Sequence, residues 1–452
     1  MAFKKVLIAN RGEIALRIQR ACHELGLATV CVYSTADAES LHVKFADESV
    51  CIGPPSPRES YLNIHALLSA AEVTGADAVH PGYGFLSENA QFARACQEMG
   101  LTFIGPSPDA IERMGHKIVA KETVHSAGVP LFPSVKLVDS KGKIRSESDL
   151  KKKVEEIGYP VLIKAAMGGG GRGMKVVRSA EELLRALDVA RSESKSAFGS
   201  EEVYIEKYCE QPRHIEFQIL ADQFGHMVHL GERDCSIQRR HQKLLEETPS
   251  PALTPLLREK MAAASLAAAK AVNYFSVGTI EFILDSDQKF YFLEMNTRIQ
   301  VEHPVTEMVT GVDLVREQIL VALGEKLTLK QPDIKFSGHS IECRITAEDP
   351  KTFAPSPGRV THFHPPMGKG VRLESSFYSD YLVSPYYDSL LCKLIVHDET
   401  RPLAIARMRE ALKEFIIRGV KTTIPLHLEI LDSPDFISGK YDTRYLSLPR
   451  AA

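Results

Sequence analysis

Apolar runs of strand length alternate with amphipathic stretches over the first quarter of the chain. FKKVLIAN (3–10) and LATVCVYS (27–34) are such runs, and the segment between them carries apolar residues at helical spacing. The alternation continues through a Pro/Gly-rich loop at 81–89 to LTFIG (101–105). Strands that alternate with helices form parallel sheets, so the pattern predicts a Rossmann-like α/β domain over residues 1–115. No G-x-G-x-x-G follows the first strand, which disfavours dinucleotide binding.

The remaining chain mixes helix and strand patterns that divide into four further segments. Residues 116–135 predict a helix and a proline-bearing linker. Residues 136–205 predict a small α+β unit in which a glycine run separates two strands. Residues 206–330 predict a strand-rich core, and residues 331–452 predict a C-terminal domain of mixed strand and helix. The expected fold class is therefore α/β in the first domain and α+β in the others.

Bulk composition excludes several classes of function. The 452 residues carry a net charge of −3, which gives no reason to expect nucleic acid or an anionic membrane as a partner. No apolar run approaches the roughly 20 residues of a membrane span, and the N-terminus does not resemble a signal peptide. The eight cysteines form no CxxC pair, which suits buried thiols in a reducing cytoplasm better than disulfides or zinc. We therefore expect a cytoplasmic protein.

The run GGGGRG (168–173) is the first candidate for chemistry. It lies between two predicted strands, whereas a P-loop would lead into a helix. Bare backbone N–H groups of such a hairpin can close on phosphate oxygens, and Lys164 and Arg172 add positive charge. We favour phosphate binding over a plain surface hairpin, and we expect the segment to act as a lid over a nucleotide.

Two further segments are ambiguous on their own. EKYC (206–209) ends a predicted strand, whose backbone could bind a base edge while Glu206 binds the base or ribose. Taken alone, this segment is better explained as an ordinary strand that ends in charged residues. QRRHQK (238–243) could bind a multiply charged anion or form a solvated basic turn, and nothing else in the segment decides between them.

Two acids on a predicted hairpin indicate a metal site. Glu281 interrupts the apolar run VGTIEFIL, and Glu294 lies on the next strand. The two would face each other directly if the turn has two residues, or diagonally if the loop has four. Like charges so placed repel, and a cation relieves the repulsion. Mg²⁺ takes one or two carboxylates together with substrate phosphates, so we predict Mg²⁺ here, with Asn296 as a neighbour.

The stretch EMNTRIQVEHP (294–304) carries polar side chains at every second position. Nine extended residues span roughly 30 Å, more than one site can use. We therefore predict that the strand bends after Asn296 and brings Arg298 and Glu302 to a neighbouring site. An arginine fork suits a carboxylate or bicarbonate, and a nearby carboxylate suits a general base.

Taken together, the motifs resemble those of biotin carboxylase, the ATP-grasp component of biotin-dependent carboxylases. The resemblance covers essentially the whole chain and rests on the following segments: VLIANRGEIALRI, HPGYGFLSEN, GGGGRGM, EKY followed by PRHIE, ERDCSIQRRHQK, EMNTRIQVEHPVTEM, ECRITAEDP and PYYDSLLCKLI. It implies an ATP-grasp fold with a Rossmann-like domain (1–115), a helical linker (116–135), a lid subdomain (136–205), a catalytic core (206–330) and a C-terminal domain (331–452).

The resemblance also implies roles for residues on the nucleotide side. ATP phosphates would be held by Lys117, Lys164 and the lid glycines Gly168, Gly169, Gly170 and Gly171. The adenine and ribose would be bound by Glu206 and by the backbone of Lys207 and Cys209. The nucleotide site would further be lined by His214, Gln238 and His241. Two Mg²⁺ or Mn²⁺ ions would be bound by Glu281, Glu294 and Asn296.

On the acceptor side, the resemblance implies a bicarbonate site and a biotin site. Bicarbonate would be held by Lys243, Arg298, the Val301 backbone and Glu302, with Glu302 as the general base. Arg344 would stabilise charge on biotin, and Tyr83 would lie near the biotin pocket. Arg17 would belong to a homodimer interface.

The implied reaction is the ATP- and bicarbonate-dependent carboxylation of biotin through carboxyphosphate. No Ala-Met-Lys-Met tetrapeptide, the context in which carriers display biotin, occurs in the chain. We therefore expect a stand-alone subunit that acts on a separate biotin carboxyl carrier protein and works with a carboxyltransferase subunit. Acetyl-CoA carboxylase is the expected system, and pyruvate or propionyl-CoA carboxylase are the alternatives. Another ATP-grasp carboxylate ligase or a non-catalytic nucleotide-binding subunit are the competing classes.

Overall fold

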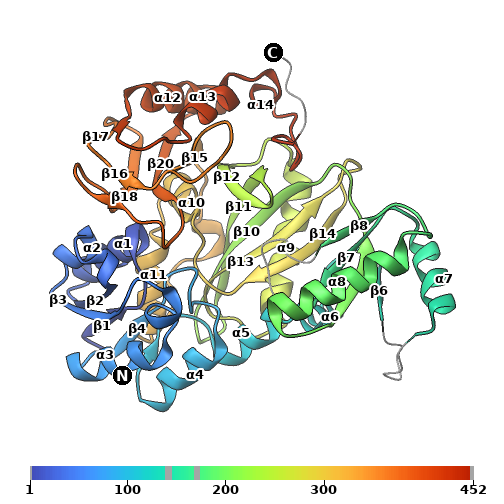
Figure 1. The fold of residues 1–452 in the computed structure, drawn as a ribbon, viewed down its shortest axis with the longest axis horizontal. Coiled ribbons are helices and arrows are strands. Elements are labelled where there is room, and N and C mark those ends of the chain that lie inside the picture. Colours follow the sequence, from blue (N-terminus) through green and yellow to red (C-terminus); the bar gives the residue numbers. More distant parts are fainter. Residues whose placement is uncertain (1–2, 138–144, 167–173, 448–452) are drawn as a thin grey trace.

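The computed structural model describes residues 3–137, 145–166 and 174–447. In those ranges the chain forms an N-terminal domain (lower left in Figure 1), a small subdomain (right in Figure 1), and a large antiparallel sheet that continues into the C-terminal domain. None of the described helices is both long enough and apolar enough to cross a membrane.

The N-terminal domain is the predicted Rossmann-like unit. Its five strands are all parallel and follow the spatial order β3-β2-β1-β4-β5. From β1 the chain adds strands first on one side of the sheet and then, at β4, on the other side. Ligands bind outside the carboxyl ends of the strands at such a change of side, and the loops after β1 and β4 meet there. The elements are β1 (Lys5–Ile8), α1 (Gly12–Glu24), β2 (Ala28–Ser34), α2 (Leu41–Lys44), β3 (Glu48–Gly53), α3 (Ile64–Thr74), β4 (Ala78–His80), α4 (Ala90–Glu98), β5 (Thr102–Phe103) and α5 (Pro108–Gly115).

Helix α1 shows why this domain packs as it does. Its residues Ile14, Ile18 and Ala21 are fully or almost fully buried and lie at helical spacing, so one face of the helix covers the sheet. Glu13 and Arg17 are also buried, which is unusual for charged residues and requires charged partners.

The small subdomain is a four-stranded antiparallel sheet of order β6-β9-β7-β8 with two helices on it. Strands β7 and β8 flank the glycine run and pair with each other, so the predicted hairpin is confirmed for the described residues. The subdomain has its own apolar core, which includes Val154, Ile163 and Ile205. Its elements are β6 (Ser134–Lys136), α7 (Glu147–Ile157), β7 (Val161–Ala165), β8 (Lys175–Val177), α8 (Leu183–Phe198) and β9 (Val203–Lys207), with α6 (Lys117–Ser126) leading into it.

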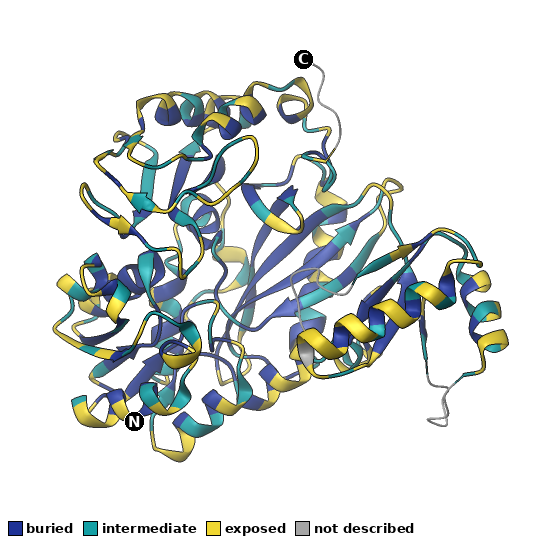
Figure 2. Ribbon diagram, viewed as in Figure 1, coloured by how far each residue is buried: buried dark blue, intermediate teal, exposed yellow. Residues whose placement is uncertain are grey.

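An eight-stranded antiparallel sheet of order β14-β13-β10-β11-β12-β15-β20-β18 joins the centre of the chain to its C-terminal part. The junction is the pairing of β12 with β15, so strands on either side of residue 330 share one sheet. The six inner strands of this sheet are mostly buried, whereas most residues of the edge strands β14 and β18 are half-buried (Figure 2). The strands of the sheet are β10 (Arg213–Ala221), β11 (Met227–Arg239), β12 (Gln242–Thr248), β13 (Ser276–Leu284), β14 (Phe290–Asn296), β15 (His339–Thr346), β18 (Val371–Ser375) and β20 (Leu390–Asp398).

Helices and short strand pairs complete the central and C-terminal parts of the chain. Helix α9 packs on β10 and β11, and α12 packs on β15 and β20. The remaining elements are α9 (Pro255–Lys270), α10 (His303–Thr310), α11 (Leu314–Ala322), β16 (Gly358–Arg359), β17 (His362–His364), β19 (Leu382–Val383), α12 (Arg401–Glu414), β21 (Ile416–Arg418), α13 (Ile424–Asp432) and α14 (Pro434–Ile437).

Candidate active site

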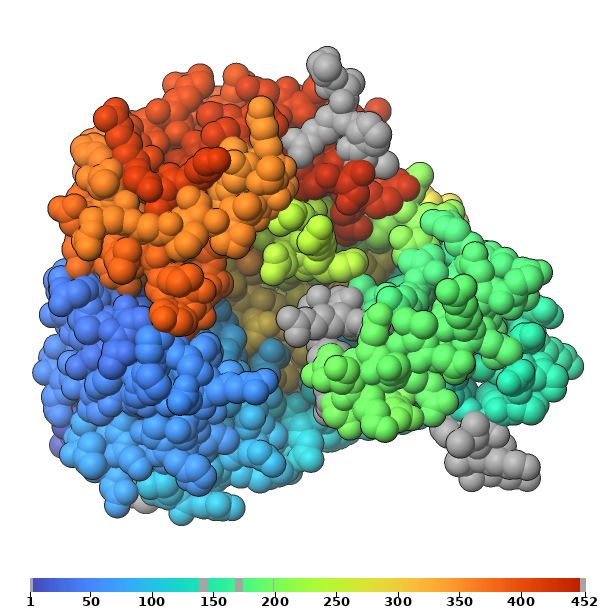
Figure 3. All heavy atoms as spheres, in the orientation of Figure 1, coloured from blue at the N-terminus to red at the C-terminus, as the bar shows by residue number. Residues whose placement is uncertain are grey.

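A cavity of about 700 Å³ lies where the N-terminal domain, the small subdomain and the large sheet meet. The space-filling view is hollowed at this point (Figure 3). Most of the predicted site residues line the cavity: Tyr83, Lys117, Lys164, Glu206, Lys207, Cys209, His214, Gln238, His241, Lys243, Glu281, Glu294, Asn296, Arg298, Val301 and Arg344. Glu302 is fully buried behind the lining, and Gly168, Gly169, Gly170 and Gly171 lie outside the described residues.

The β13–β14 hairpin places Glu281 directly opposite Glu294. The register shifts between Glu281 and Phe282, because Leu293 is an extra residue in β14. The turn is a three-residue loop that ends with Gln288 in the left-handed region, at φ 63°. The open question about these two acids is therefore settled in favour of direct opposition, but a bulge produces it rather than a two-residue turn.

The polar row that begins at Glu294 is only partly a strand. β14 ends at Asn296, turns follow, and α10 begins at His303. The predicted change of direction after Asn296 is present, but the prediction of one bent strand is wrong, because the chain leaves the sheet there. Arg298 folds back over the turn and donates to Asn296 Oδ1 and Gln300 Oε1, each at 2.9 Å.

Glu281 is the best-connected acid of the site. His214 Nε2 lies 2.8 Å from its Oε2, while Lys243 Nζ at 2.9 Å and Asn296 Nδ2 at 2.8 Å reach its Oε1. Burial alone would raise the pKa of Glu281, but Lys243 and His214 outweigh burial and hold that pKa well below its usual range. The carboxylate is therefore ionised at neutral pH.

The donor set on this hairpin fits a hard divalent cation. Glu281 and Glu294 oppose each other across the strand pair, and the Asn296 amide lies next to Glu281. All three offer oxygen atoms, which Mg²⁺ prefers. Lys117 Nζ lies 3.2 Å from Glu294 Oε2, so side-chain ammonium groups now balance both acids.

Two side-chain clusters in the described ranges have metal-ligand spacing. Both include Glu216, and one of them shares Glu281 with the hairpin. The oxygens of Glu216 are already taken by Arg233 Nε at 2.5 Å and Lys243 Nζ at 2.6 Å. A metal at either cluster would compete with these buried cations for Glu216, and metal binding by the hairpin acids stays a prediction.

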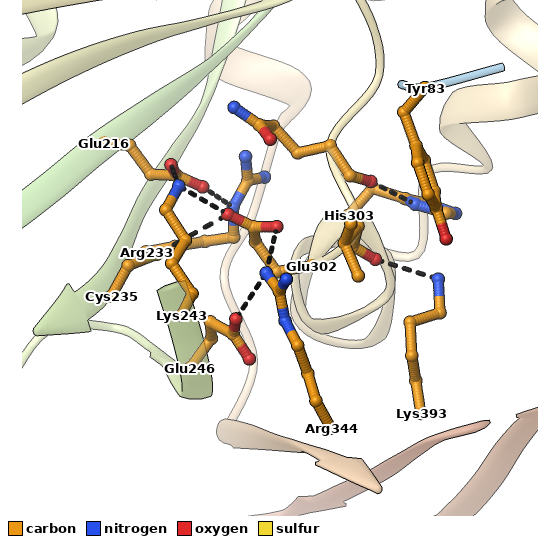
Figure 4. Close-up of polar contacts among 12 residues, drawn as sticks. Tyr83, Glu216, Arg233, Cys235, Lys243, Glu246, Glu302, His303, Arg344 and Lys393 are labelled. Atoms are coloured by element: carbon orange, nitrogen blue, oxygen red, sulfur yellow. Dashed lines mark hydrogen bonds and ion pairs between the residues drawn. The ribbon is translucent and has the colours of Figure 1, made fainter. Parts of the chain in front are cut away.

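Lys243 contacts both Glu281 on the hairpin and Glu302, and Figure 4 shows its contact with Glu302. Its Nζ lies 2.7 Å from Glu302 Oε1, while Arg344 NH2 lies 2.9 Å from Glu302 Oε2. Burial would raise the pKa of Glu302, but Lys243, Arg344 and the fully buried Arg233 lower it well below its usual range. Glu302 is thus an ionised carboxylate held by two cations that both line the cavity.

A surplus of positive charge surrounds Glu206, which lines the same cavity. Lys121 and Lys164 both contact the single carboxylate of Glu206, which lowers the pKa of Glu206 to about 2 although burial opposes the change. Burial lowers the pKa of Lys121, and Lys164 adds to this effect although Glu206 opposes it. Two ammonium groups that share one carboxylate leave a net positive charge for an anion such as phosphate.

Sequence reasoning missed several residues of this site. Glu216 lies within the apolar run RHIEFQIL, so the signal that singled out Glu281 was also present there. Arg233 is fully buried beside it, in β11. Glu88 accepts from Arg298 Nε at 2.9 Å, and nothing in its loop sequence indicates this contact. Arg17 lies within the chain against Glu307 and Asp313, so its role in a dimer interface stays a prediction.

Three family models together match almost the whole chain. The model described as biotin carboxylase, N-terminal domain, matches residues 2–111. The carbamoyl-phosphate synthase L chain, ATP binding domain, matches residues 116–330, and the biotin carboxylase C-terminal domain matches residues 342–448.

Full-length relatives and solved structures agree with these models. Biotin carboxylase 1 of Bacillus subtilis is 56% identical over 98% of each chain, and the chloroplastic biotin carboxylase of Arabidopsis thaliana is 56% identical over 98% of this chain and 82% of its own. The structure of a Campylobacter jejuni biotin carboxylase–ATP complex superposes with a TM-score of 0.94 at 51% identity, covering 98% of each chain. The chain has the ATP-grasp biotin carboxylase fold and belongs to the biotin carboxylase family.

Proposed function

We propose that the chain uses ATP and bicarbonate to carboxylate biotin carried on a separate biotin carboxyl carrier protein. The observation that carries this proposal is the position of Lys243. Its ammonium group contacts Glu281, a proposed metal ligand, at 2.9 Å and Glu302, the proposed base, at 2.7 Å. The site for the transferring phosphate and the site for its acceptor are therefore adjacent.

ATP would lie between the small subdomain and the β13–β14 hairpin. Lys117 and Lys164 would contact its phosphates, with Gly168, Gly169, Gly170 and Gly171 as a proposed clamp. Glu206, Lys207, Cys209, His214, Gln238 and His241 would surround the rest of the nucleotide. The two Mg²⁺ or Mn²⁺ ions that Glu281, Glu294 and Asn296 would hold supply charge neutralisation at the phosphates. In support, a solved relative from Hydrogenobacter thermophilus, 52% identical with a TM-score of 0.93, is described with MgADP and bicarbonate.

Bicarbonate would lie against Arg298, Lys243 and the Val301 backbone. Glu302 accepts its proton, and the bicarbonate oxygen attacks the γ-phosphorus while the bond to ADP breaks. Carboxyphosphate then releases CO₂ and phosphate, and the phosphate takes the ureido proton of biotin. Arg344 would stabilise negative charge on the ureido oxygen as biotin attacks CO₂, with Tyr83 beside the ring.

The low pKa of Glu302 limits how this step can occur. A carboxylate stabilised by Lys243 and Arg344 is a weak base while both cations contact it. Bicarbonate and biotin are expected to compete for these cations, which would leave Glu302 less stabilised and more basic. The base becomes effective only when substrates are in place, which limits wasteful ATP cleavage.

The proposal includes partners that act before and after this step. A biotinylated carrier protein supplies the acceptor, and a carboxyltransferase subunit uses the carboxybiotin. Acetyl-CoA carboxylase is the system we propose, with pyruvate or propionyl-CoA carboxylase as alternatives. A homodimer and a cytoplasmic location complete the proposal; the Hydrogenobacter relative is described as a dimer.

Steady-state ATP cleavage tests the proposal against another ATP-grasp ligase. We expect ADP release to require bicarbonate and to increase when free biotin is added. Cleavage driven by an amino acid or another carboxylate, and indifferent to biotin, would assign the site to a different ligase. The chelator EDTA should abolish cleavage, and added Mg²⁺ should restore it.

A further inference from the structure

A half-buried arginine and a buried lysine face each other across neighbouring strands of the C-terminal part. Arg344 on β15 is paired in register with Lys393 on β20. Like charges opposite each other repel, and the repulsion is stronger away from water. Lys393 is nevertheless fully buried, and it is not among the residues that line the cavity. Its position therefore requires a structural reason.

Each cation contacts one of two consecutive residues in the turn before α10 (Figure 4). Arg344 NH2 lies 2.9 Å from the Glu302 carboxylate, and Lys393 Nζ donates to the Val301 carbonyl oxygen at 2.8 Å. The strand pair β15–β20 thus fixes both the side chain of Glu302 and the peptide group that precedes it.

Lys393 also contacts the N-terminal domain. Its Nζ lies 3.2 Å from Glu13 Oε2 on α1, and the other oxygen of Glu13 accepts a hydrogen bond from the Tyr83 hydroxyl. The ammonium group lies 5.8 Å from the centre of the Tyr83 ring. A buried cation needs such partners, and here they form one path from Val301 through Lys393 and Glu13 to Tyr83.

We propose that Lys393 is a positioning residue that aligns the bicarbonate end of the acceptor pocket with its biotin end. This inference rests on the proposed function, which places bicarbonate at Val301 and biotin at Tyr83. Lys393 fixes the Val301–Glu302 peptide group directly and the Tyr83 ring through Glu13. Displacements of about 1 Å in such groups can cost roughly 10²-fold in rate, so the contact matters although Lys393 touches no substrate.

The Lys393→Met variant tests this role, because methionine nearly preserves the volume and removes the donor. We expect the KM for bicarbonate and the KM for free biotin each to rise at least about tenfold, while the KM for ATP stays within about twofold. A loss of stability alone would lower the active fraction without separating the three KM values. Lys413→Met is the matched control: Lys413 pairs with Glu410 on the surface of α12, and its loss should leave all three KM values unchanged.

Lys393→Met leaves the Glu13 carboxylate buried beside no cation, which could prevent folding. The double variant Glu13→Gln/Lys393→Met removes both charges, and it should fold and show the same KM pattern. If both variants keep wild-type KM values for bicarbonate and biotin while the wild type is active, the positioning role is wrong. If the wild type itself shows no bicarbonate-dependent ATP cleavage, the proposed function fails, and this inference fails with it.

Discussion

At the scale of single residues, Lys243 holds the site together electrostatically. It contacts Glu216, Glu281 and Glu302 at 2.6, 2.9 and 2.7 Å. Lys243→Met would leave three close carboxylates with less neutralisation, so we expect ATP cleavage to fall about 10²–10³-fold. Urea unfolding should show that the free energy of unfolding of this variant is about 3–5 kcal/mol lower than that of the wild type, because removing one partner leaves buried charge uncompensated. More than half of wild-type activity in this variant would contradict the assignment.

The lowered pKa of Glu206 predicts how the free energy of unfolding depends on pH. Its pKa of about 2 in the folded chain lies below the ordinary carboxyl value of 4.5, so its stabilising effect is complete above pH 4.5 and is lost as pH falls toward 2. Between pH 4.5 and 3 the free energy of unfolding of the wild type should fall by roughly 2 kcal/mol more than that of a Glu206→Gln variant. Urea unfolding at both pH values measures this difference. Parallel pH dependence in the two proteins would contradict the charge assignment.

Whether the role of a single residue could be predicted depended on the residues next to it in the sequence. Glu281 was identifiable because an acid inside an apolar strand needs a partner. Lys393 lies in a similar run, LLCKLIVHD, but its partners Val301 and Glu13 are 92 and 380 positions away. Local patterns show that a buried charge needs a partner, but only the folded chain shows which residue provides it.

At the scale of elements, the β13–β14 hairpin was predicted and its details were not. The apolar run VGTIEFIL marked the first strand, KFYFLEM marked the second, and the two acids were expected on one face. The bulge at Leu293 has no clear local signal, yet it determines which residue faces Glu281. The pairing of β12 with β15 was missed because residues 242–248 and 339–346 are far apart in sequence.

Nucleotide binding should change hydrogen exchange in particular elements. Lys164 on β7 and Glu294 on β14 face the same cavity from different parts of the chain. A nucleotide with Mg²⁺ that contacts both should slow amide exchange in β7, β9 and β14 by at least about fivefold, because binding makes local opening of these strands less favourable. Strands β2 and β3, none of whose residues line the cavity, serve as the internal control. Equal slowing in β2 and β3 would contradict this placement of ATP.

At the scale of the whole molecule, three parts of the chain contribute to one cavity. The N-terminal domain was predictable because its strands and helices alternate regularly. The sheet shared by the central and C-terminal parts was not, because antiparallel pairing between distant segments leaves no periodic signal. The glycine run lies outside the described residues, so its role as a phosphate clamp stays a prediction.

The proposed homodimer gives a prediction at the same scale. A single chain has a mass of 50.1 kDa, so light scattering coupled to size exclusion should give twice that value, about 100 kDa. A mass near 50 kDa at micromolar concentration would contradict the dimer but not the chemistry of the cavity.

The most direct test of the proposed function is transfer of label from [¹⁴C]bicarbonate to biotin. Purified protein with ATP, Mg²⁺ and free biotin should form acid-labile labelled carboxybiotin. Omission of ATP, or the substitution Glu302→Gln, should reduce the product by at least about 10²-fold, since no proton acceptor remains at that position. Labelled product without ATP, or full activity of Glu302→Gln, would contradict the account.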